Sequence, residues 1–359
     1  MNRKQFIVLL AVVAVIAAAG WVVYQRGNSS WQQANQAIGG KLLPNLQVND
    51  VAQISIQSAT NRVIVEKTNG LWRVRERAGY PADFSRVSGV LTKLADLKIV
   101  QDEEIGPSQL GRFDLLPPDA AANGGTEVEI KDQSGKTLAS VLLGKVHSNQ
   151  QGGGEGWPDG RYVKTGSGQQ VALISDPLDN IQPKPEDWLD KTFFRIQNPR
   201  MIEVTFPAAT NSWELTRSSA TNNWELADAK PGEKLDSTKI ESVTSPFDSP
   251  AFDDVRAGAG APGAADSVNV ETFAGVNYAA KIWPAKDDNY LMTVSVSAPG
   301  ESAKGGKPEA DAGALAQGKQ LANWTYEVPG YTVEPLLKTR AQLLVESNAA
   351  PASPTAGEP

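Results

Sequence analysis

The sequence predicts an α+β protein in which an N-terminal transmembrane helix is followed by two tandem copies of a mainly antiparallel β unit, each with a packed helix. Three observations predict it. The N-terminus carries a long apolar segment without charges, short motifs recur further along the chain, and strand-like segments are joined in pairs by glycine-containing turns. A repeat of roughly 150 residues has the length of a domain and exceeds that of a solenoid unit.

The predicted membrane anchor is residues 6–24, which hold no charged residue and follow two basic ones. At about 1.5 Å per residue, such a helix crosses a hydrocarbon layer of roughly 30 Å. Phe6 begins this segment, and Trp21 and Tyr24 suit the aromatic belt at a membrane interface. We expect a single-pass protein of the bacterial cytoplasmic (inner) membrane, with a cytoplasmic N-terminus and the bulk of the chain in the periplasm.

A cleaved signal peptide is the alternative interpretation, since Ala17-Ala18-Ala19 precedes Gly20 as a small-residue cleavage pattern does. The apolar segment nevertheless continues through Trp21-Val22-Val23-Tyr24, where a cleavable signal should turn polar. The sequence therefore favours an anchor that is retained.

The repeat consists of three landmarks that return in the same order. Ile54-Ser55-Ile56, Ala59-Thr60-Asn61 and Trp72-Arg73-Val74 reappear as Val204-Thr205-Phe206, Ala209-Thr210-Asn211 and Trp224-Glu225-Leu226. They divide the chain into an anchor with a short cytoplasmic end, a juxtamembrane spacer, two α+β repeats and a disordered tail. The expected bounds are 1–27, 28–50, 51–197, 198–346 and 347–359.

Within the first copy, residues 51–56 alternate as a half-buried strand does, and residues 63–66 and 71–74 flank Asn69-Gly70 as a hairpin. Asp83 is placed to cap a helix whose apolar residues, 87 to 97, share one face. A second hairpin joins 128–130 to 138–143 at Gly135.

The second copy repeats these elements. A hairpin joins 213–215 to 224–226, Asp236 is placed to cap a helix carrying Ile240 and Val243, and a second hairpin turns at Gly275. The copies should close with a strand and a helical segment, 171–175 with 181–194 and 324–328 with 333–345. Four stretches rich in small and polar residues are expected to be loops, at 106–125, 147–160, 256–266 and 298–319.

Composition removes several classes of function. The formal net charge is −7 and no basic run occurs, so we expect no nucleic-acid partner. The chain has no cysteine, which excludes disulfides, thiol catalysis and zinc–thiolate sites. Its single histidine, His147, stands beside Ser148, but no Gly-x-Ser-x-Gly motif accompanies them. Gly135-Lys136-Thr137 lacks the earlier glycine of a phosphate-binding loop, because position 130 is Ile130.

The sequence thus offers no catalytic, cofactor or metal site, and it leaves three contact candidates. Asp287 and Asp288, followed by Asn289, are the best placed of the acidic pairs to contact a cation or partner, although a solvated turn is the more ordinary interpretation. Trp157, within Glu155-Gly156-Trp157-Pro158, has no counterpart in the repeat and is the tryptophan most expected to be an exposed contact residue.

One run of motifs resembles a known family. Tyr80-Pro81-Ala82-Asp83-Phe84, the apolar helix that follows and Leu110-Gly111-Arg112-Phe113-Asp114-Leu115 before Pro117-Pro118 resemble the bacterial domain-of-unknown-function family 4340. The family pattern normally has Gly-Leu near the position of Asp114-Leu115, so this chain departs slightly from the pattern there. The resemblance implies a membrane-anchored protein often encoded beside gliding-motility-type ABC transporter genes. No catalytic residue accompanies it.

These observations lead to three hypotheses in order of preference. The first is a non-enzymatic accessory or scaffold subunit that binds protein partners, such as membrane subunits associated with an ABC transporter. The second is an extracytoplasmic glycan- or peptide-binding module that serves a transporter. The third is a cell-envelope hydrolase, for which the sequence shows no catalytic set.

Overall fold

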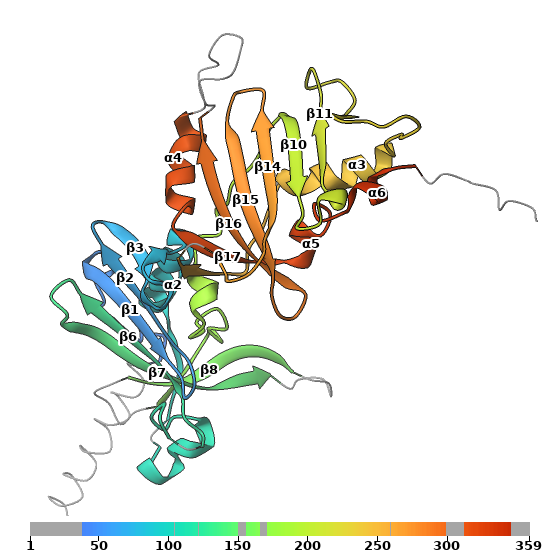
Figure 1. Cartoon of the computed structure of the whole chain (residues 1–359). Helices are drawn as coiled ribbons and strands as arrows, with labels where there is room; N and C mark the ends of the chain where they lie inside the picture. Colours follow the sequence, from blue (N-terminus) through green and yellow to red (C-terminus); the bar gives the residue numbers. More distant parts are fainter. Residues whose placement is uncertain are drawn as a thin grey trace, which may run out of the picture. The chain divides into compact units, whose positions relative to one another are not determined.

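The structure is a computed structural model that describes residues 38–103, 105–120, 122–149, 156–165, 171–258, 260–298 and 312–345. The expected anchor with Phe6, Trp21 and Tyr24, and the expected tail, lie outside these residues. No helix within the described ranges is long and apolar enough to span a membrane. The protein is α+β, with two mostly antiparallel sheets and few helices (Figure 1). The chain divides into two compact units, Met1–Asp190 and Lys191–Pro359.

The first unit contains one sheet, which has nine strands among the described residues, in the order β4-β3-β2-β1-β6-β7-β8-β9-β5. Each neighbouring pair runs antiparallel. The strands are β1 (Val51–Gln57), β2 (Arg62–Thr68), β3 (Leu71–Val74), β4 (Tyr80–Pro81), β5 (Ile99–Glu103), β6 (Thr126–Asp132), β7 (Thr137–Asn149), β8 (Trp157–Thr165) and β9 (Val171–Ile174).

The predicted hairpins of the first unit are confirmed. Asn69 and Gly70 both have positive φ, 52° and 81°, which lets Thr68 pair directly with Leu71 across the turn between β2 and β3. Gly135, at φ 84°, turns the chain between β6 and β7. Both turns thus use the left-handed backbone that their residues adopt easily.

The predicted helix of the first unit is also confirmed, as α2 (Phe84–Asp96). Its cap is the Asp83 carboxylate, which accepts hydrogen bonds from the backbone N–H groups of Ser85 and Arg86 at 2.8 and 3.1 Å. The apolar side chains of one face are buried, namely Val87, Val90, Leu91 and Leu94. Trp188 is fully buried near the start of α2, and its carbonyl accepts from the N–H of Asp83.

The second unit contains one sheet, which has eight strands in the described ranges, in the order β12-β11-β10-β14-β15-β16-β17-β13. The strands are β10 (Pro199–Thr205), β11 (Trp213–Thr216), β12 (Glu225–Leu226), β13 (Asp254–Ala257), β14 (Asp266–Thr272), β15 (Asn277–Pro284), β16 (Asn289–Ser297) and β17 (Trp324–Pro329). The helices are α3 (Ser237–Thr244), α4 (Ala312–Leu321), α5 (Gly330–Val333) and α6 (Arg340–Leu343).

Asp236 caps α3 as predicted, accepting from Thr238 N and Lys239 N at 3.0 and 3.3 Å, and Ile240 and Val243 are buried. The two sheets arrange their strands in the same order. If β1 corresponds to β10, β2 to β11, β3 to β12 and β5–β9 to β13–β17, each strand has a matching place in the chain and in the sheet. Among the described strands, β4 has no counterpart. The first sheet therefore continues one strand beyond β3, whereas the second sheet ends at β12.

Several sequence expectations were wrong. Residues 181–194 form one short 3-10 turn, Pro185–Trp188, rather than a helical segment, because Pro183 and Pro185 remove backbone donors that a helix needs. Residues 333–345 contain only the end of α5 and the four-residue α6. The expected loop at 298–319 was wrong at its C-terminal end, because α4 begins at Ala312 despite the glycines and prolines of this stretch. The helix packs closely on β16, since a Cβ on Gly318 would lie 2.4 Å from Val296 Cβ.

The expected loop at 147–160 was also wrong at both ends, because β7 continues to Asn149 and β8 begins at Trp157. Gly160 lies within β8, where a Cβ would approach the carbonyl oxygen of Ile174 to 2.4 Å. Glycine at this position therefore reflects close contact between neighbouring strands and does not mark a loop.

Candidate functional site

The residues singled out in the sequence lie in separate places. Trp157, in the first unit, is the first residue of β8, pairs with Asn149 and is 86% exposed. Asp287 and Asp288, in the second unit, form the turn between β15 and β16 with φ of 55° and 59°. Both aspartates are exposed, and the described residues contain no group of three His, Cys, Asp or Glu that could hold a metal ion.

His147 lies in β7, and its Nδ1 is 2.6 Å from Asp159 Oδ1 across the pair with β8. Asp159 was not singled out in the sequence, since twelve residues separate the two and the intervening segment looked like a loop. Within the described chain, no hydrogen bond connects Ser148 to this pair. The imidazole of His147 and the carboxylate of Asp159 thus pair across two neighbouring strands.

A groove in the second unit combines more of the features of a binding site. Its volume is about 650 Å³, and it lies beside β12 and α3. The floor is apolar, with Leu226 and Ile240 buried and Trp224 half-buried. Its remaining lining residues are Asn222, Asn223, Glu225, Ala229, Glu233, Lys234, Leu235, Ser237, Glu241 and Thr244.

The groove occupies the place where the first unit has paired strands. There, β4 pairs with β3, and Ala82 N donates to Trp72 O at 2.9 Å. In the second unit the corresponding donor is Leu235 and the corresponding acceptor is Trp224, yet no hydrogen bond joins them in the described ranges. Ala82 and Leu235 occupy corresponding positions, because each directly precedes the capping aspartate of a helix and each forms an isolated β-bridge. Ala82 pairs with Leu189, and Leu235 pairs with Leu344.

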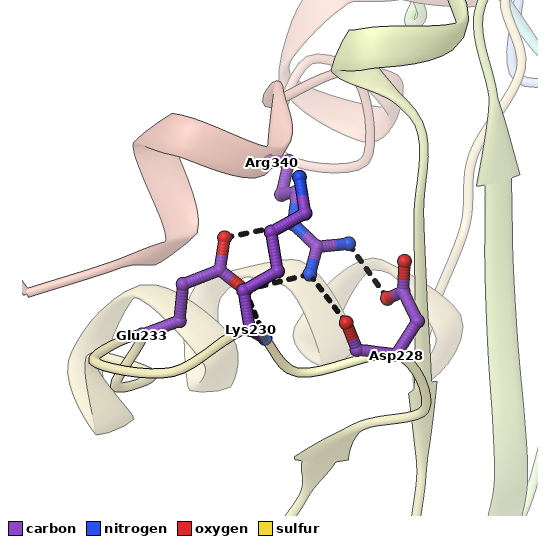
Figure 2. Close-up of polar contacts among 4 residues, drawn as sticks. All are labelled: Asp228, Lys230, Glu233 and Arg340. Atoms are coloured by element: carbon purple, nitrogen blue, oxygen red, sulfur yellow. Dashed lines mark hydrogen bonds and ion pairs between the residues drawn. The ribbon is translucent and has the colours of Figure 1, made fainter.

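An ion-pair cluster of Arg340, Asp228 and Glu233 contains one of the lining residues of the groove, Glu233 (Figure 2). Arg340 of α6 is 7% exposed, and its guanidinium donates to Asp228 Oδ1 at 2.6 Å and to Asp228 O at 3.1 Å. It also donates to the Glu233 carboxylate at 3.2 and 2.7 Å. The backbone N–H of Lys230 donates to the same carboxylate at 2.9 Å. The segment between β12 and α3 is therefore attached to α6.

The cluster also changes the acidity of its members. The hydrogen bond from Arg340, followed by the one from the Lys230 backbone, lowers the pKa of Glu233 to about 2. The hydrogen bond from Arg340 lowers the pKa of Asp228 as well. The bonds to Glu233 and then Asp228 raise the pKa of Arg340 above its usual value. The three side chains accordingly remain charged across the ordinary pH range.

Trp224, on the floor of the groove, is held by Arg217. The guanidinium carbon of Arg217 lies 4.5 Å from the centroid of the indole ring. Arg217 is itself fixed, donating to Pro199 O at 2.7 Å and to Ala220 O at 2.8 Å. The indole N–H of Trp224 donates to no residue of the described ranges, whereas that of Trp188 donates to Gln182 O at 3.0 Å.

Sequence reasoning missed this groove. Trp224 and Trp72 occupy equivalent positions among the landmarks of the expected repeat, a placement typical of structural residues. In the structure Trp72 is 9% exposed, whereas Trp224 is half-buried and lines the groove. The signal that was overlooked lies before the second helix cap. Where the first unit has Tyr80-Pro81 before its helix cap, the second unit has Glu233-Lys234, so charged residues stand in place of an edge strand.

Comparison with known proteins adds one finding. Residues 72–269, which are 198 of the 359 residues, match the family described as Domain of unknown function (DUF4340). No curated protein and no solved structure matches the chain. The matched region runs from β3 in the first unit to β14 in the second and includes α2 and the groove. The chain therefore belongs to the DUF4340 family.

Proposed function

We propose that this protein is a non-enzymatic accessory subunit that binds a partner protein at the outer edge of its second sheet. The observation that carries the proposal is the groove beside β12, which combines an apolar floor, an open strand edge and charged lining residues, one of which, Glu233, is held by Arg340. Protein-binding sites of this kind supply backbone hydrogen bonds and pockets for side chains. We further propose that the two units are tandem copies of one domain, which their common strand order supports.

The proposal includes a location and a class of partner. The charge-free residues 6–24 support a single membrane anchor, with the two units in the periplasm. The kinship with DUF4340 proteins leads us to propose a membrane subunit associated with a gliding-motility-type ABC transporter as the partner. Trp157, Asp287 and Asp288 are exposed and are proposed as further contact residues.

Affinity purification tests this function. The full chain, tagged at its C-terminus, is cross-linked in cells, solubilised in mild detergent and compared with a tagged anchor that contains residues 1–37. We expect the full chain to recover transporter membrane subunits that the anchor control does not. Recovery of the same proteins by both would contradict a partner-binding role for the two units.

A glycan-binding module is the second candidate, favoured by one observation. Trp157 presents 86% of its surface at the start of β8, and an exposed aromatic face can stack on a sugar ring. Thermal shift of the full, detergent-solubilised chain with cell-wall oligosaccharides tests it. A specific rise in midpoint that disappears in Trp157→Ala would favour this function, since a ligand that binds the folded state stabilises it.

A further inference from the structure

We propose that the groove takes up an extended segment of the partner that contains an aromatic residue and basic residues, and that this segment joins the sheet as a strand beside β12. The inference rests on the proposed protein-binding function and specifies its partner chemistry. The first unit shows the arrangement within one chain, since β4 adds Tyr80 and Pro81 to the edge of β3.

The backbone of β12 is oriented for such an addition. Ala227 N donates to Glu214 O of β11 at 3.0 Å, so Ala227 and, two residues earlier, Glu225 face β11. Successive residues of a strand direct their backbone groups to opposite sides, so those of Trp224 and Leu226 face away from β11 and toward the groove. Their carbonyl oxygens accept no hydrogen bond from the described residues.

The corresponding groups of the first unit are satisfied. Trp72 O accepts from Ala82 N at 2.9 Å, and Val74 O accepts from Gly79 N at 3.0 Å. The two donors, Gly79 and Ala82, directly precede and follow β4. An added strand would therefore supply to Trp224 and Leu226 the hydrogen bonds that the first unit provides internally.

The side chains define the chemistry of the added segment. Glu225 and Glu241 line the groove, and within the described ranges neither carboxylate forms an ion pair, whereas Glu233 is paired with Arg340. The lining also contains one lysine, Lys234. A segment with lysine or arginine thus complements Glu225 and Glu241. An aromatic side chain of that segment would pack on the apolar floor as Tyr80, which is 5% exposed, packs in the first unit.

The chain's own C-terminal residues are a less suitable occupant. The last described residue before them, Val345, lies beside the groove, because its N–H donates to Lys234 O at 2.9 Å. Residues 346–359, however, contain three prolines, two glutamates and no basic or aromatic residue. Prolines lack the N–H that a strand donates, and the glutamates would face Glu225 and Glu241. The composition therefore favours a partner segment.

Fluorescence anisotropy with the full, detergent-solubilised chain tests the inference. The probe is a labelled ten-residue peptide in which tyrosine and valine alternate with lysine, and its control replaces each lysine by glutamate. We expect the protein to bind the lysine peptide and not the glutamate control. The double variant Glu225→Lys, Glu241→Lys should bind the lysine peptide at least tenfold more weakly. Both positions are exposed, and a circular dichroism melt checks that the variant is folded.

Two peptides methylated on the backbone nitrogens of odd or even residues identify strand addition. A strand edge uses the N–H groups of alternate residues, so one methylated peptide should bind normally and the other should lose binding. Equal binding by both, or no binding of the unmodified lysine peptide, would overturn the inference. Tenfold tighter binding after deletion of residues 346–359 would also overturn it, because the tail would then be the occupant.

The proposed function can be separated from this inference. If Glu225→Lys, Glu241→Lys leaves recovery of the partner in the affinity experiment unchanged, the strand-addition inference is wrong and protein binding at another surface remains. If the full chain recovers no more than the anchor control, the proposed function itself is wrong.

Discussion

Arg340 holds the carboxylate of Glu233 through two hydrogen bonds, one from Nε at 3.2 Å and one from Nη2 at 2.7 Å. The first unit has an ion pair of opposite polarity in the corresponding place, with Arg77 after β3 and Glu186 near the C-terminal end of that unit, 3.3 Å apart. Each unit thus attaches the segment after its third strand to its own C-terminal part. In the first unit that segment also pairs with the sheet, whereas in the second it borders a groove.

The first prediction concerns the stability of the protein at low pH. Glu233 has a pKa of about 2 in place of its ordinary 4.5. Since its pKa is depressed in the folded protein, its contribution to stability is complete above about pH 4.5 and declines as the pH falls toward 2. We expect the thermal midpoint to fall more steeply over this window in the natural protein than in Glu233→Gln. Parallel decreases in the two proteins would contradict the pairing.

The second prediction concerns Arg340. Replacing it with methionine leaves Asp228 and Glu233 without their common donor, so the second unit should lose stability. Arg200→Met is the matched control, because Arg200 pairs with Glu271 while half exposed, and such surface pairs contribute about 0–1 kcal/mol. Chemical denaturation should show a clearly larger loss for Arg340→Met. An equal loss for both variants would show that the cluster is no stronger than a surface pair.

The third prediction concerns two buried threonines of the second unit. The hydroxyl of Thr332, 6% exposed, has no hydrogen-bond partner among the described residues, whereas that of Thr325 donates to Gly258 O and accepts from Gly260 N, both at 2.7 Å. Thr332→Val should therefore keep or raise the thermal midpoint. Thr325→Val should lower the free energy of unfolding by about 1–3 kcal/mol, because the N–H and C=O of the loop lose their partner.

The fourth prediction concerns the caps of α2 and α3. Asp83→Ala and Asp236→Ala each remove a carboxylate that accepts two backbone N–H groups. Each should lower the free energy of unfolding by about 0.5–2 kcal/mol, and Asp→Asn at the same positions should lose little, since asparagine caps nearly as well. Equal losses for alanine and asparagine would indicate that charge, and not capping, is the stabilising feature.

Those two caps also show what can be predicted from the sequence. Local patterns located them, because a capping aspartate and its apolar face lie within one or two turns, and the Asn69-Gly70 hairpin was found for the same reason. The groove was not found, since it depends on whether a distant residue, Arg340, attaches the segment at Glu233. Nor could spacing reveal that His147 meets Asp159, because this contact depends on the register of β7 with β8.

The final prediction concerns two glycines of the first unit whose roles differ. Gly144 lies in β7, where a Cβ would approach the carbonyl oxygen of Phe113 to 2.3 Å and Leu115 Cδ2 to 2.8 Å. The carbonyl is backbone and Leu115 is 1% exposed, so neither group can move without disturbing its neighbours. Gly144→Ala should therefore destabilise the first unit and reduce the thermal midpoint.

Gly89 is the matched control, because it lies on the exposed face of α2 and a Cβ there would meet nothing within 4 Å. Alanine in a helix is favoured over glycine by roughly 0.5–1 kcal/mol, so Gly89→Ala should raise the midpoint. Circular dichroism melts of both variants check the pair. Opposite signs are expected, because at Gly144 the added methyl group overlaps backbone, while at Gly89 it only restricts the unfolded chain. A stabilised Gly144→Ala variant would show that β7 and the segment at Phe113 are not in contact.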